Sequence, residues 1–201
     1  MALIAPSSGD VIKELLAQLY TCTTSTECLK IAGDLAGSLK VLGVTSLISF
    51  GVLEHLSSGI KDKKSGLVRE GALLGIWGIA KGMGRMVEPY LLELLPTVLE
   101  ALADKGQPVR EAAQLATSVI IDLFSEHSAK IVLPVLYDGM SKKWQIKIGA
   151  LEQLESLVNK SPIYIAFALP TVIKHVEHCL HDTKPEAILA LHFWLLSNSY
   201  N

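Results

Sequence analysis

The chain has 201 residues, with 18 Lys and Arg against 20 Asp and Glu, which gives a formal net charge of −2. Half of the residues are hydrophobic and 19% are charged, a composition that excludes an intrinsically disordered chain. The balanced charge argues against a nucleic-acid footprint over the whole domain and leaves room for a local basic patch. Because aromatic residues make up only 6%, the core is expected to be aliphatic, which favours a helical protein.

The sequence shows no sign of membrane insertion or secretion. No uncharged run reaches the 18 apolar residues of a membrane span. The first ten residues lack the basic region and long apolar core of a signal peptide. Cys22, Cys28 and Cys179 are odd in number and form no CxxC motif. This pattern predicts three reduced thiols in an intracellular, cytoplasmic protein.

Two independent landmarks recur along the chain with nearly the same period. VREGA at 68–72, VREAA at 109–113 and IKIGA at 146–150 place a basic residue at spacings of 41 and 37. Prolines inside apolar segments recur at spacings of 38 and 36, and they are Pro96, Pro134 and Pro170. A unit of this length holds two helices. We expect five helix pairs, at 10–40, 52–85, 86–126, 129–160 and 164–196.

The third unit shows the pattern most clearly. Apolar residues between 87 and 102 recur at i, i+3 and i+4, as in an amphipathic helix. The polar stretch 104–108 then breaks the helix, and Pro108 suits the first turn of the next one. A 36- to 41-residue period with a proline bending the first helix fits HEAT repeats better than TPR or ankyrin repeats. The sequence therefore predicts an all-α fold, an armadillo-like α-solenoid of about five HEAT-type helix pairs.

Motifs that carry chemistry are missing from the sequence. There is no GxxxxGK[ST] phosphate loop, and the glycines at 71–84 match no dinucleotide fingerprint, so we expect them to serve close helix packing. His175, His178, Cys179, His181 and Asp182 make zinc binding conceivable. The favoured interpretation is a polar helix end with Cys179 packed inward. The sequence predicts no catalytic residue, no metal and no cofactor, and hence no enzyme.

Positive charge gathers at two places. Residues 61–69 and residues 142–147 each sum to +3, and both stretches are expected at the turn between the two helices of a pair. Such turns line one edge of a solenoid. Lysine and arginine side chains there can neutralise phosphates, and Trp144 can stack on a base if it is exposed. The alternative is a solvated turn with Trp144 tucked under its own helix pair. The candidate binding residues are Lys61, Lys63, Lys64, Arg69, Lys142, Lys143, Trp144 and Lys147.

Several segments together resemble a known family. GIKDKKSGLVREGAL at 59–73, VEPYLLELLP at 87–96, KKWQIKIGALEQLESL at 142–157 and HDTKPE at 181–186 are similar to the N-terminal HEAT domain of translation elongation factor three. The resemblance covers roughly residues 50–186 and implies binding to the ribosome, through rRNA and ribosomal proteins. In that family, ATP-binding cassettes that this chain lacks drive the release of tRNA. The EPY, REGA and LP elements also resemble the general-control scaffold that activates a starvation kinase.

The resemblance divides the chain into three parts. Residues 1–45 form a weakly matched helix pair, residues 46–186 the HEAT repeats, and residues 187–201 a divergent apolar tail. In that tail Ile188 stands where earlier units have Arg110 and Lys147, which suggests a truncated product. The expected function is that of a non-catalytic module that docks on the ribosome, alongside other translation factors, during elongation. The alternative is a protein–protein scaffold of the general-control type, without direct RNA contact.

Overall fold

The computed structural model describes residues 7–180, and within them the chain is helical without a strand. Three short 3-10 turns, at Gly84–Val87, Ala101–Ala103 and Glu126–Ser128, join longer helices. None of the helices in this range is long and apolar enough to cross a bilayer. In chain order the helices are α1 (Ser8–Leu19), α2 (Ser25–Leu42), α3 (Ser46–Ser49), α4 (Val52–Ile60), α5 (Gly66–Met83), α6 (Glu88–Glu100), α7 (Gln107–Leu123), α8 (Ala129–Met140), α9 (Trp144–Lys160) and α10 (Pro162–Leu180).

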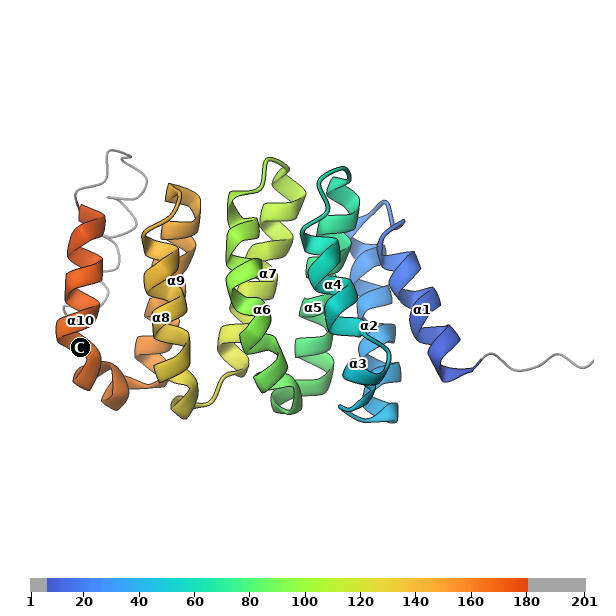
Figure 1. The fold of residues 1–201 in the computed structure, drawn as a ribbon, viewed down its shortest axis with the longest axis horizontal. Helices are drawn as coiled ribbons and strands as arrows, with labels where there is room; N and C mark the ends of the chain where they lie inside the picture. Colours follow the sequence, from blue (N-terminus) through green and yellow to red (C-terminus); the bar gives the residue numbers. More distant parts are fainter. Residues whose placement is uncertain (1–6, 181–201) are drawn as a thin grey trace, which may run out of the picture.

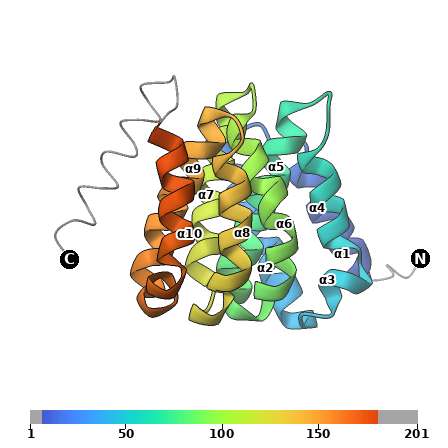
Figure 2. The same ribbon diagram turned by 60° about the vertical axis from the view of Figure 1, so that its left-hand side comes forward.

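The helices stack as antiparallel pairs in two layers (Figures 1 and 2). The pairs are α1/α2, α4/α5, α6/α7 and α8/α9, and the one-turn α-helix α3 between the first two pairs was not predicted. One layer holds α2, α5, α7 and α9, and the other holds α4, α6, α8 and α10. The predicted α-solenoid is confirmed. Helix α10 packs against α8 and α9 as the first helix of a fifth pair. The second helix expected for that pair, and the tail at 187–201, lie outside the described residues.

Local signals in the sequence set where the helices begin. Ser7 forms a capping box with Asp10 at the start of α1, and the Thr24 and Ser65 hydroxyls accept hydrogen bonds from backbone N–H groups in the first turns of α2 and α5. Pro108 lies in the first turn of α7, as expected. The three repeated prolines lie inside helices α6, α8 and α10, where each removes a backbone hydrogen bond.

A stripe of glycines on α5 lets the backbones of neighbouring helices approach it closely. A Cβ added at Gly71 would lie 1.9 Å from the carbonyl oxygen of Leu19, and one at Gly78 would lie 2.5 Å from that of Ala32. No real Cβ atom tolerates such distances to a backbone atom. Twelve of the eighteen residues of α5 are buried, and the helix packs between α2, α4 and α7. The prediction that these glycines serve helix packing is confirmed.

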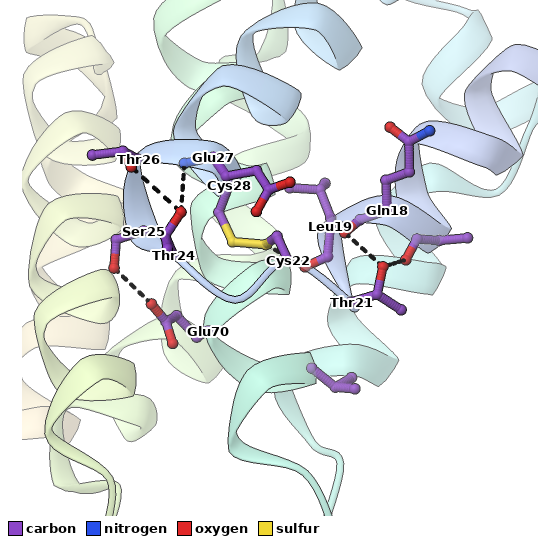
Figure 3. The surroundings of a disulfide bond; sticks show 12 residues. Gln18, Leu19, Thr21, Cys22, Thr24, Ser25, Thr26, Glu27, Cys28 and Glu70 are labelled. Atoms are coloured by element: carbon purple, nitrogen blue, oxygen red, sulfur yellow. Dashed lines mark hydrogen bonds between the residues drawn. A yellow bond between two sulfur atoms is a disulfide. The ribbon is translucent and has the colours of Figure 1, made fainter.

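The turn between α1 and α2 corrects one prediction. Cys22 and Cys28 are joined by a disulfide, although the sequence pattern predicted reduced thiols (Figure 3). The turn after Tyr20 reverses the chain and brings their Cα atoms to 5.7 Å, within the range that a disulfide spans. The absence of a CxxC motif did not exclude a disulfide, because two cysteines six residues apart meet across a tight helix–turn–helix connection. Cys179 is a buried thiol on α10, as predicted for that residue.

Candidate functional site

The turns within the helix pairs lie along one edge of the solenoid, the upper edge in Figure 1. Three of them carry the charged residues of interest, at 61–65 between α4 and α5, at 104–106 before α7, and at 141–143 between α8 and α9. The structure therefore brings both predicted basic clusters to the same edge. It separates them by the turn at 104–106, and the side chains within each cluster differ widely in exposure.

The turn at 61–65 is organised by the side chain of Asp62. Its Oδ1 accepts hydrogen bonds from the backbone N–H groups of Ser65 at 2.7 Å and Lys64 at 2.8 Å. These two bonds stabilise the carboxylate and lower the pKa of Asp62. Because the backbone is held in this way, Lys61, Lys63 and Lys64 extend from a defined turn, and all three are exposed.

Arg69 follows the same cluster in sequence, but its guanidinium points into the protein. It is only 7% exposed and forms a two-pronged ion pair with Asp104, with Nε–Oδ2 at 2.8 Å and Nη2–Oδ1 at 3.0 Å. Its Nη1 donates to the backbone carbonyls of Asp62 and Ser65. Arg69 therefore fastens its own turn and links it to the next repeat. The prediction that placed it among the surface cations is not supported by this geometry.

The same contacts determine the direction in which the pKa of the partner carboxylate, Asp104, is shifted. Burial acts to raise the pKa of Asp104, but hydrogen bonds from Arg69 and from the Gly106 N–H outweigh it, and the pKa lies below its ordinary value. The repeated basic position has the same local role one unit later. Arg110 Nη1 donates to the carbonyls of Asp104 and Lys105, at 2.8 and 3.1 Å. This recurring residue thus closes the turn of its own repeat.

The second predicted cluster is largely engaged within the protein. Lys142 pairs with Asp138 Oδ2 at 2.8 Å and with Glu100 Oε1 at 2.9 Å, which raises the pKa of its ammonium group. Lys147 occupies the repeated basic position on α9 and is only 7% exposed. Trp144 is half-buried, between the two alternatives that the sequence left open. Lys143, just before α9, is the fully exposed cation of this cluster.

Sequence reasoning missed one exposed cation of this edge, Lys105. The charges of residues 104–111 sum to zero, so a local charge sum does not single out Lys105. In the structure Asp104 is ion-paired with the buried Arg69, whereas Lys105 is exposed. Pairing across two repeats, rather than the local charge sum, decides which charges reach the surface. We name the exposed cations of these three turns the lysine edge; it consists of Lys61, Lys63, Lys64, Lys105 and Lys143.

The opposite edge is held by polar contacts that serve packing. The Glu88 carboxylate at the start of α6 accepts hydrogen bonds from the Ser125 N–H and from the hydroxyls of Ser125 and Ser128. Lys160 at the end of α9 donates to the carbonyls of Ile121 and Asp122 in the last turn of α7. These groups join neighbouring repeats, so we do not assign them to the candidate site.

The histidines near the end of α10 also have a structural environment. The ring of His175 stacks on that of Tyr137, with centroids 4.1 Å apart, and His178 lines a small cavity of about 240 Å³ beside this pair. Cys179 is buried and donates to the His175 carbonyl. In residues 7–180 no three His, Cys, Asp or Glu side chains gather as a metal site would require. His181 and Asp182 lie outside the described residues.

The fold and the turns define the class of protein. Stacked antiparallel helix pairs, prolines within the first helices and turn-closing arginines in two successive units describe a HEAT/armadillo-like repeat scaffold, a non-enzymatic kind of domain. A designed armadillo repeat protein in complex with a (KR)4 peptide shares the fold, with a TM-score of 0.50 and 18% identity over 92% of this chain and 81% of its own.

The family follows from sequence comparison. Residues 28–188 match the family described as EF3 N-terminal HEAT repeat, and the chain belongs to this family. Elongation factor 3 of Gonapodya prolifera is 33% identical over 179 residues, covering 88% of this chain and 16% of the relative. Stalled ribosome sensor GCN1 of Homo sapiens is 32% identical over 181 residues, covering 90% and 7%. The chain thus spans less than a fifth of the length of either relative.

Proposed function

We propose that this chain is a non-catalytic HEAT-repeat module of an elongation-factor-three-like protein, which binds the ribosome in the cytoplasm during translation elongation. The observation that carries the proposal is the lysine edge, with five exposed ammonium groups on successive turns of one side. Lysine side chains neutralise backbone phosphates without reading the base sequence, as docking on rRNA requires. Two relatives with names that refer to elongation and to ribosomes support it.

The proposal differs from the sequence prediction in the residues that contact phosphate. Arg69 and Lys147 are buried, and Lys142 is held by two carboxylates, so we do not place these three against rRNA. Lys105 joins the surface because its neighbouring carboxylate is engaged elsewhere. The exposed part of Trp144, beside Lys143, remains available to stack on an unpaired base. Ribosomal proteins that border such rRNA complete the proposed contact.

Co-sedimentation with purified ribosomes at about 50 mM and at about 200 mM salt tests this proposal. For three or more phosphate contacts, affinity is expected to fall at least about 20-fold between these conditions. A variant with Lys61→Glu, Lys63→Glu and Lys64→Glu should lose pelleting at the lower salt. Its matched control carries the same charge reversal at exposed lysines away from this edge, namely Lys30→Glu, Lys40→Glu and Lys81→Glu.

A second candidate function is a protein–protein scaffold of the general-control type. The observation that favours it is the internal use of the second basic cluster, in which Lys142 is ion-paired and Lys147 is buried. GCN1 also matches this chain about as well as elongation factor 3 does. Pelleting with ribosomes that survives both the higher salt and the Lys61/Lys63/Lys64 reversal would favour this scaffold and contradict phosphate contact.

A further inference from the structure

Helices α4 and α6 are neighbours in the layer of first helices (Figures 1 and 2). A groove of about 560 Å³ lies between them. Its apolar base is formed by Leu53 of α4 and by Tyr90 and Leu94 of α6. Leu94 is buried, while Leu53 and Tyr90 are half-buried. Ser57 on α4 and Thr97 on α6 also line the groove, and both side chains are small. Larger side chains at these positions would fill the space.

The rims of this groove are acidic. Glu54 on one wall and Glu93 on the other are both exposed and both line the same space. Neither carboxylate forms a salt bridge with another residue of the described range. An apolar wall lowers the local dielectric, so two facing carboxylates attract a cation more strongly there than on an open surface. The same pair repels a phosphate backbone.

The groove therefore combines three features that suit one kind of ligand. A long cationic side chain can lay its methylene groups on Leu53 and Leu94 while its charged end meets the carboxylates. The face of Tyr90 offers an arginine guanidinium a stacking surface, which lysine uses less well. The hydroxyls of Ser57 and Thr97 can exchange hydrogen bonds with a peptide backbone. Lys61 lies at one end of the groove and disfavours a second cation there.

We propose that the α4/α6 groove binds a basic, arginine-containing segment of a partner protein, with a guanidinium between Glu54 and Glu93 and an apolar neighbour over Leu53 and Leu94. This surface shares Lys61 with the lysine edge, at the end of the groove, but its carboxylates carry the opposite charge to that edge. The chain would thereby offer phosphates one surface and basic protein segments another. The proposal does not depend on whether the lysine edge contacts rRNA.

Fluorescence anisotropy with a fluorescein-labelled peptide of alternating Arg and Leu tests the proposal on the full chain. Matched Ser-Leu and Glu-Leu peptides report apolar and nonspecific binding. We expect the Arg-Leu peptide alone to bind, and Glu54→Gln with Glu93→Gln to weaken it about tenfold or more, because the cation loses both partners. Glu14→Gln with Glu111→Gln removes two exposed carboxylates elsewhere and should leave binding unchanged.

Two further variants separate this groove from general attraction by charge. Ser57→Leu fills the groove and keeps both carboxylates, so it should abolish peptide binding while the thermal unfolding midpoint stays near that of the wild type. Lys63→Glu with Lys64→Glu should not weaken the peptide, whatever it does to ribosome binding. Equal affinity for the Glu54/Glu93 double variant and the wild type would overturn the proposal. The proposal would also be overturned if an oligouridylate displaced the peptide from the wild type and bound less tightly to the Glu54/Glu93 double variant.

Discussion

Asp104 shows how a single carboxylate can determine both the stability and the surface of this protein. It receives two hydrogen bonds from Arg69 in the preceding repeat and one from the Gly106 N–H in its own turn. The side chains of the ion pair are only 9% and 14% exposed. Removal of one partner leaves the other buried without compensation, which is more destabilising than the net contribution of the pair. Lys105, next to Asp104 in the sequence, is exposed on the lysine edge, whereas the side chain of Asp104 is turned toward Arg69.

Asp104→Asn should therefore destabilise the protein by about 2–4 kcal/mol, because Arg69 keeps its charge and loses its counter-charge. The loss should depend on pH. The pKa of Asp104 is lowered in the folded state, so its contribution is complete above the ordinary carboxyl pKa of about 3.9 and disappears as the pH falls through the folded-state value. Urea unfolding of the wild type and of Asp104→Asn, repeated from about pH 7 down to about pH 2.5, measures this difference in the free energy of unfolding.

The control for this variant is Asp34→Asn, which neutralises an exposed carboxylate on α2. It should change the free energy of unfolding by less than about 0.5 kcal/mol. A stability difference between wild type and Asp104→Asn that stayed constant down to the lowest pH would show that the Asp104 charge is not the source of the effect.

At the scale of the helix, the packing of α5 combines buried leucines and isoleucines with glycines that let neighbouring backbones approach. Gly71 and Gly78 face backbone carbonyls, which cannot rotate away as a side chain can. On α2 the situation is the reverse, since Gly33 and Gly37 have no heavy atom within 4 Å of a built Cβ. Glycines in the two helices thus look alike in the sequence and differ in what surrounds them.

This contrast predicts that a Gly→Ala substitution lowers the stability of the protein at Gly78 and raises it at Gly33. Gly78→Ala should destabilise the protein by about 2–3 kcal/mol, because α2 and α5 must separate to admit the methyl group. Gly33→Ala should stabilise it by about 0.5–1 kcal/mol, because alanine favours the helix and meets no neighbour. Chemical unfolding monitored by far-ultraviolet circular dichroism compares the two. Equal stabilisation by both substitutions would mean that α5 does not approach α2 as closely as the structure has it.

The positions and order of the helices could be predicted from the sequence, but the directions in which the charged side chains point could not. Period, prolines and caps are local signals, so the pairs fall where Pro96, Pro134 and Pro108 indicated. The burial of Arg69 depends on Asp104, 35 residues away in the next repeat, and no local pattern marks that pairing. The proximity of Cys22 and Cys28 likewise depends on how tightly one turn reverses the chain.

At the scale of the molecule, each repeat contacts only its neighbours, so the first pair has one neighbour to hold it. The turn between α1 and α2 is tied by the disulfide and by Ser25 donating to Glu70 on α5 (Figure 3). The Tyr20 hydroxyl also donates to the His55 carbonyl on α4. The disulfide is the covalent one among these restraints. The N-terminal end is therefore the place where redox conditions act on the solenoid.

Reduction of the Cys22–Cys28 disulfide should lower the stability of the N-terminal pair by about 2 kcal/mol, as expected for a short closed loop. In a chain of this size that corresponds to a fall of about 4–8 °C in Tm, provided that the array unfolds as one unit. Thermal unfolding with and without dithiothreitol measures it, and hydrogen exchange should locate the increased opening in α1 and α2. The double variant Cys22→Ser, Cys28→Ser should have the Tm of the reduced wild type, and dithiothreitol should not change that Tm. Alkylation of all three cysteines in the folded, unreduced protein, instead of none or Cys179 alone, would contradict the disulfide itself.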